Sequence, residues 1–73
     1  MKINYNGLWK VMIDKGMNKK ELMEEVGLSP ATVAKMTKGE FVSMQVLYRI
    51  CIKLDVDFKD IIEIGNREDK HDR

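Results

Sequence analysis

The sequence predicts an all-α domain of five short helices, and three observations carry that prediction. Apolar residues recur at intervals of three and four over most of the chain, which is the period of a helix with one buried face. Side chains that cap helix N-termini, those of Asn18, Ser29, Ser43 and Asp57, stand directly before such stretches. The chain has 73 residues, 44% of them apolar and 34% charged, which is typical of one small folded domain.

The first helix is expected over about residues 7–14, where Leu8, Val11 and Met12 share one face and Trp9 lies beside them. These side chains are therefore candidates for the core. A glycine two positions beyond this range is expected to end the helix.

The second helix is expected to begin after Asn18. The side chain of Asn18 can accept from the first turn, and Glu21 three residues later can accept from the Asn18 amide, as in a capping box. Leu22 and Val26 lie four apart on one face. Gly27 supplies the left-handed backbone that ends many helices.

The third helix is expected directly afterwards, with Ser29 as its N-cap and Pro30 at its first position. Val33 and Met36 point inward and Gly39 follows as the end signal. Two short helices joined by so tight a turn predict a helix-turn-helix at residues 18–39. An outer face that is small and basic suits a DNA groove, and it comprises Pro30, Ala31, Thr32, Lys35 and Lys38.

The fourth helix has the clearest helical period of the chain. Ser43 is its expected N-cap, and Leu47, Ile50, Cys51 and Leu54 follow at positions that share one face. The cysteine has no second Cys with which to form an internal disulfide and no neighbouring metal ligand. We therefore expect it to be a small apolar packing residue rather than a reactive thiol.

The fifth helix is short, with Asp57 as its cap and Asp60 in the reciprocal capping position. Gly65 is expected to end the ordered domain, so that residues 1–65 form the domain and residues 66–73 a polar, disordered tail. The residues expected to close the core from this helix are Phe58, Ile61 and Ile62.

The two ends of the domain leave a short β pairing open. Ile3 and Tyr5 alternate with polar residues, and the segment IIEI at residues 61–64 is β-prone. Residues 2–5 and 61–64 could therefore pair as a two-stranded ribbon.

A family resemblance is carried by NKKELMEEVGLSPATVAKMTKG at residues 18–39, with LWKVMIDKGM before it and SMQVLYRICIKLDVDFKDII after it. Over about residues 8–62 the chain resembles the Cro/C1-type (XRE-like) helix-turn-helix domain of bacterial and phage repressors, in its short single-domain form. The resemblance implies a lambda-repressor-like fold in which the first helix of the pair meets the DNA backbone and the second enters the major groove. It also implies that Lys19 meets phosphate.

The chain departs from the pattern of this family in two ways within its helices. Family members often carry Gln at the start of both helices of the pair, where this chain has Lys19, Pro30 and Ala31. Many also pair a basic residue of the first helix with a Glu near the end of the third, and these places hold Met12 and Thr37. Base contacts are therefore expected to be mainly apolar and electrostatic.

Charge is divided unequally along the chain. Residues 1–39 hold seven Lys and four acidic residues, a balance of +3, whereas residues 40–73 hold six basic and eight acidic residues, a balance of −2. A positive face attracts DNA phosphates. We expect phosphate contacts from Lys19, Lys20, Ser29 and Lys38, and base contacts from Ala31, Thr32 and Lys35. For Lys20, a merely solubilising role is an equal alternative.

Further apolar residues lie beyond the needs of one small core, and an exposed apolar patch often marks an interface. The expected dimer interface comprises Met44, Tyr48, Ile52 and Ile64. Two copies related by a two-fold axis would place their reading helices about 34 Å apart, one turn of DNA. The alternative, that Tyr48 and Val46 complete the core, stays open.

The sequence favours a cytoplasmic, sequence-selective DNA-binding transcriptional regulator, acting as a repressor or autoregulator, and it offers no residues that form a catalytic centre.

 The chain has no paired catalytic side chains, no metal-ligand cluster, no phosphate-binding loop, and no apolar run long enough to span a membrane, so we expect no enzyme activity, metal, cofactor, small-molecule ligand or membrane partner. The rival hypothesis is a helical protein-interaction module, such as an antitoxin-like or adaptor domain. It is favoured by the loop after Gly39, which has Glu40, Phe41 and Val42 where the family often has basic residues.

Overall fold

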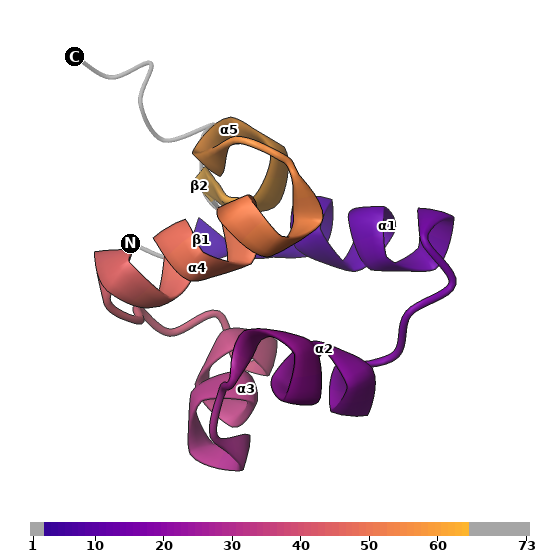
Figure 1. The fold of residues 1–73 in the computed structure, drawn as a ribbon. Coiled ribbons are helices and arrows are strands. Elements are labelled where there is room, and N and C mark those ends of the chain that lie inside the picture. Colours follow the sequence, from indigo (N-terminus) through magenta and orange to yellow (C-terminus); the bar gives the residue numbers. More distant parts are fainter. Residues whose placement is uncertain (1–2, 65–73) are drawn as a thin grey trace, which may run out of the picture.

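The computed structural model describes residues 3–64, which contain five helices and two short strands (Figure 1). In chain order the elements are β1 (Ile3–Asn4), α1 (Asn6–Asp14), α2 (Lys19–Val26), α3 (Pro30–Thr37), α4 (Met44–Leu54), α5 (Phe58–Ile61) and β2 (Glu63–Ile64). The predicted helices are all confirmed, and the first begins one residue earlier than expected. The expected domain end at Gly65 and the tail at 66–73 lie outside the described residues.

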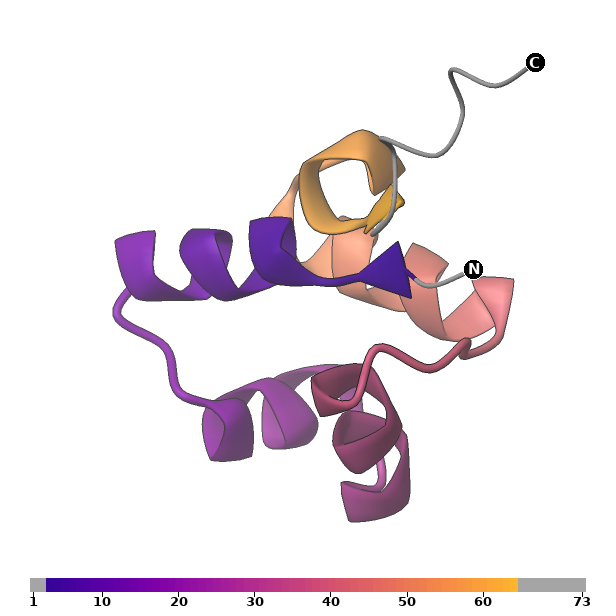
Figure 2. The ribbon, with the colours of Figure 1, turned by 180° about the vertical axis from the view of Figure 1, so that it is seen from behind.

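The helices form two groups around one core. Helices α1, α4 and α5 lie on one side, and the α2–α3 pair lies on the other (Figures 1 and 2). Helix α3 is at the opposite end of the molecule from α5. The α2–α3 pair is therefore carried at one edge of the domain, where its outer surface is open to a partner.

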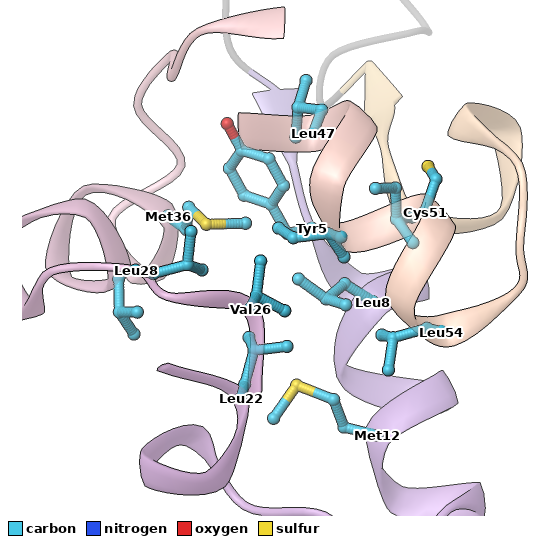
Figure 3. Close-up of a cluster of buried hydrophobic side chains, with 13 residues drawn as sticks. Tyr5, Leu8, Met12, Leu22, Val26, Leu28, Met36, Leu47, Cys51 and Leu54 are labelled. Carbon is cyan, nitrogen blue, oxygen red and sulfur yellow. The ribbon is translucent and has the colours of Figure 1, made fainter. Parts of the chain in front are cut away.

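The core is apolar and draws on every helix (Figure 3). Its buried residues are Tyr5, Leu8, Met12, Leu22, Val26, Leu28, Val33, Met36, Leu47, Ile50, Cys51, Leu54 and Ile61. The inward-facing positions predicted for α2, α3 and α4 are all among them. Trp9 and Val11 are half-buried at the edge of this core. Burial raises the pKa of the Cys51 thiol, in keeping with a packing role.

The prediction for α5 was wrong at one residue. Phe58 is 38% exposed, whereas Ile61 is fully buried and Ile62 packs partly against the core. The reason is the length of the helix, since a helix of about one turn can bury only one side. Residues Ile61 and Ile62 thus close this end of the core.

The β pairing left open by the sequence is present. Strands β1 and β2 pair antiparallel, with Ile3 opposite Ile64 and Asn4 opposite Glu63. The backbone of Gly39 passes close to this ribbon. A Cβ atom added at Gly39 would lie only 2.7 Å from the carbonyl oxygen of Ile3. The ribbon therefore packs against the segment that follows α3.

Tyr5 makes a second connection to that segment. Its hydroxyl donates a hydrogen bond of 2.7 Å to the carbonyl oxygen of Glu40, and its ring is almost fully buried. Burial raises the pKa of the hydroxyl above its ordinary value. The end of α3 is thereby fixed to the N-terminal part of the domain.

Among residues 3–64, no helix is long and apolar enough to cross a membrane. Within that range, no group of three or more His, Cys, Asp or Glu side chains is placed to hold a metal ion.

Candidate nucleic-acid interface

The start and end of α2 follow from local chemistry. Asn18 Oδ1 accepts a hydrogen bond of 2.8 Å from the Glu21 amide, and Glu21 Oε1 accepts one of 2.9 Å from the Asn18 amide. The predicted capping box is therefore complete. At the other end Gly27 has a φ of 82°, the left-handed conformation that ends the helix at little cost for glycine.

Helix α3 begins as predicted. The Ser29 hydroxyl accepts from the Thr32 amide at 3.2 Å, and Pro30 occupies the first helical position. The hydroxyl groups of Ser29 and Thr32 also lie 3.0 Å apart, within hydrogen-bonding distance. The Thr32 hydroxyl is thus already engaged within the protein, and its side chain is half-buried.

The outer face of α3 gathers most of the predicted reading residues. Val33 and Met36 are buried. The exposed residues of α3 and its C-cap are Pro30, Ala31, Ala34, Lys35, Thr37 and Lys38. Ala34 was not predicted on this surface, although a residue three positions after Ala31 falls on the same side of a helix. The face combines short side chains, which permit close approach, with two ammonium groups.

Lys19, at the start of α2, is exposed but is held by two neighbours. Its Nζ lies 4.5 Å from the centroid of the Trp9 ring and donates a hydrogen bond of 3.0 Å to Thr37 Oγ1. One side chain thereby joins α1, α2 and the end of α3. Thr37 stands at one of the two positions whose side chains form an ion pair in many family members and cannot form one here. The next predicted phosphate contact, Lys20, is exposed.

Arg49 is a supporting residue that sequence reasoning missed. From α4 its Nη2 donates to the carbonyl oxygens of Val26 and Gly27, at 2.8 and 3.1 Å. These carbonyls belong to the end of α2, where backbone acceptors lack helical partners. No spacing rule links residue 49 to residue 27, so this contact could not be predicted from the sequence.

The outer face of α4 is large and apolar. Met44, Tyr48 and Ile52 recur every four residues and are 63%, 57% and 65% exposed. Ile64 on β2, the fourth residue of the expected dimer interface, is 46% exposed. Val46 packs partly against the core, as the alternative interpretation held, but Tyr48 does not complete the core. Tyr48 and Ile52 border a shallow groove with Glu25, Val26, Arg49 and Lys53.

A tight pair of capped helices, with a small and basic outer face on the second, defines a helix-turn-helix DNA-binding domain. Comparison with protein families gives the same class in sharper form. The family model for the Cro/C1-type helix-turn-helix DNA-binding domain matches residues 7–65, and the chain belongs to this family.

A solved structure agrees with this assignment. The chain is similar to the transcriptional regulator VanUg, crystal form II, with 52% sequence identity and a TM-score of 0.85. The similarity covers 88% of this chain and 85% of that one. No match was found among curated proteins. Both matches are to DNA-binding or regulatory proteins, which points to a protein that is not an enzyme.

Proposed function

We propose that this chain is a sequence-selective transcriptional regulator, acting as a repressor or autoregulator, that places α3 in the major groove of DNA. The observation that carries the proposal is the outer face of α3, where small side chains stand beside Lys35 and Lys38. A helix that fits the groove must let its backbone approach the bases closely, and basic side chains supply the attraction to phosphate.

The contacts divide into two kinds. We assign phosphate contacts to Lys19, Lys20, Ser29 and Lys38, which lie at the ends of α2 and α3. Lys35 lies within α3 and can donate to guanine O6 or N7. Ala31 and Thr32 face thymine methyl groups or base edges. Since the Thr32 hydroxyl pairs with Ser29, its methyl group is the part left for apolar contact.

We also propose that the protein works as a homodimer in the cytoplasm. The apolar outer face of α4, with Met44, Tyr48 and Ile52, supports an interface with a second copy, and Ile64 extends the apolar surface on β2. A two-fold axis would then present two α3 helices to successive major grooves, about 34 Å apart. The expected operator is a palindrome.

The test begins by selecting bound sequences from a random pool of duplex DNA. Binding of the selected duplex should weaken steeply with salt, with a slope of several units in a plot of log affinity against log salt. Lys35→Ala should change the base preference, whereas Lys19→Ala should weaken all sequences similarly. Lys59→Ala is the matched control, because this lysine is on α5, at the far end from α3.

Two outcomes would contradict the proposal. One is that no duplex binds above the nonspecific level, and the other is that Lys35→Ala leaves the base preference of the selected duplex unchanged. For the dimer, light scattering that reports only a monomer at tens of micromolar, with and without the selected duplex, removes the two-fold arrangement.

One observation favours a second candidate function. The apolar face of α4 would also serve a helical protein-interaction module, such as an antitoxin-like or adaptor domain. In that case α3 makes no DNA contact, and substitution of Ile52 abolishes partner binding while Lys35→Ala has no effect. The same duplex selection therefore separates the two functions.

A further inference from the structure

A lysine, a tryptophan and a threonine meet where α1, α2 and α3 come together. The ammonium group of Lys19 lies 4.5 Å from the centroid of the Trp9 ring and 3.0 Å from Thr37 Oγ1. The three residues come from three different helices. An exposed lysine on a helix surface normally has a freely rotating side chain, but this one has two partners.

The hydrogen bonds of this cluster have a fixed direction. Thr37 Oγ1 donates to the carbonyl oxygen of Val33 at 3.0 Å, so the threonine proton is already used. The oxygen is left to accept from Lys19 Nζ. A lysine ammonium has three N–H donors and no acceptor. With one donor on Thr37 and the aromatic face beside it, the ammonium still has N–H capacity directed to solvent.

The ring that supports Lys19 is itself held in place. Trp9 packs edge-to-face against Tyr5, with the ring centroids 6.5 Å apart and an interplanar angle of 61°. Tyr5 is 1% exposed and bonded through its hydroxyl to Glu40. The aromatic surface under the ammonium is therefore anchored in the core. A cation over a tryptophan ring is attracted by the negative face of the ring.

We propose that Trp9 and Thr37 are positioning residues that hold the Lys19 ammonium ready for a DNA phosphate. The inference rests on the proposed DNA-binding function and deepens it. A free lysine loses rotamer entropy when it is immobilised on a ligand. In this protein that loss is taken on folding, when Lys19 is placed between Trp9 and Thr37. Phosphate binding then engages the remaining N–H donors without ordering the side chain anew.

Substitution of Lys19 and substitution of its two supporting residues should differ in their effect on the salt slope of duplex binding. Lys19→Met removes a phosphate contact, so it should lower the salt slope of duplex binding by about one unit. Thr37→Val removes the accepting oxygen and keeps the shape of the side chain. It should weaken binding about 2- to 10-fold, the range expected for ordering one long side chain, with the slope unchanged.

The experiment is a double-mutant cycle on the full chain, measured with the selected duplex at several salt concentrations. Thr37→Val and Trp9→Leu are each made alone and together with Lys19→Met. We expect either change to weaken binding in the native background and to have no effect once Lys19 is methionine. Thr37→Ser keeps the hydroxyl group and should bind as the native protein does.

Fluorescence gives a readout that does not depend on DNA. Trp9 is the single tryptophan of the chain, so its emission reports only this site. Lys19→Met should change the emission of the free protein, and Lys20→Met, one residue away, should leave it unchanged. An emission that responds to neither substitution would mean that Lys19 does not rest on Trp9, which overturns the proposal.

The binding measurements can also contradict the inference. If Thr37→Val weakens binding as much in the Lys19→Met background as in the native one, Thr37 acts through α3 itself and the inference fails while the proposed function stands. If the native protein binds no duplex in a salt-dependent manner, the proposed function fails and the inference fails with it. Should Trp9→Leu not fold, the Thr37→Val and Thr37→Ser pair completes the test alone.

Discussion

Helices α3 and α4 each bury one side in the same core, but their outer faces differ in chemistry. The outer face of α3 carries Ala31, Ala34 and Lys35, which are short or charged. The outer face of α4 carries Met44, Tyr48 and Ile52, which are long and apolar. Water solvates the first kind of face well. Covering the second kind gains about 25 cal/mol for each Å² of apolar surface removed from water.

The two faces are therefore suited to different partners. A face of small residues and ammonium groups binds a charged polymer that must come close, and it loses that binding when salt is added. A face of large apolar residues binds another apolar surface and responds little to salt. One small domain can therefore meet DNA through α3 and a second protein surface through α4.

The largest expected effect comes from comparing two isoleucines on α4. Ile50 is fully buried, whereas Ile52 is 65% exposed. Ile50→Ala should lower the free energy of unfolding by about 2 to 5 kcal/mol, because it removes buried methyl groups and leaves a cavity. Ile52→Ala should change the unfolding of dilute protein by less than about 0.5 kcal/mol but weaken self-association. Urea denaturation and sedimentation equilibrium measure the two quantities.

Two results for Ile52→Ala would contradict this prediction. If Ile52→Ala destabilises dilute, monomeric protein as much as Ile50→Ala does, the outer face of α4 packs inside the fold. The contrast with α3 then no longer holds. If neither stability nor association changes, α4 has no role as an interface between copies.

A second prediction concerns the link between α4 and the turn that carries α3. Arg49→Met removes the two hydrogen bonds to the carbonyl oxygens of Val26 and Gly27. We expect a loss of about 1 to 2 kcal/mol in the free energy of unfolding, because Arg49 is exposed and water competes for its hydrogen bonds. Duplex affinity should fall as well, because the end of α2 sets the position of α3.

Lys53→Met is the matched control for this prediction. Lys53 is also on α4, and its Nζ lies 3.5 Å from Glu25 Oε1 on α2, with both side chains about half exposed. An exposed ion pair of this kind contributes about 0 to 1 kcal/mol. Equal losses for the two variants in urea denaturation would show that a positive charge on α4 matters, rather than the bonds to the turn.

Whether a contact can be predicted from the sequence depends on how far apart its two residues are along the chain. Asn18, Gly27 and Ser29 act on backbone groups within four residues of themselves, so their roles follow from short spacings. The contacts of Lys19 with Thr37, and of Arg49 with Gly27, join residues 18 and 22 positions apart. Such contacts depend on how the helices pack, and no local pattern encodes them.

For the candidate site, the surface could be predicted but the arrangement of its side chains could not. The exposure of Ala31 and Lys35 follows from helical periodicity. That Lys19 rests on Trp9 required the position of α1 relative to α2. The exposure of Phe58 could not be predicted for a similar reason, because the neighbouring elements decide which side of so short a helix is buried.

The smallest expected effect on stability concerns the start of α5, at the opposite end of the molecule from α3. Asp60 Oδ2 accepts a hydrogen bond of 2.9 Å from the Asp57 amide, and Lys59 Nζ lies 3.4 Å from Asp60 Oδ1. The amide hydrogen bond from Asp57 holds the pKa of Asp60 below its ordinary value; desolvation opposes this shift, and Lys59 adds a further lowering.

A lowered pKa means that the unfolded chain binds the proton more tightly than the folded one, so the contribution of Asp60 to stability is present above the unfolded pKa, about 3.9. It is lost as pH falls through the lower, folded value. Asp60→Asn removes the titration, and the stability difference between native protein and variant should shrink as pH falls from 7 to 3. Urea denaturation across this range measures it. A difference that is independent of pH would mean that the charge of Asp60 does not stabilise α5, and that its cap acts only as a neutral hydrogen bond.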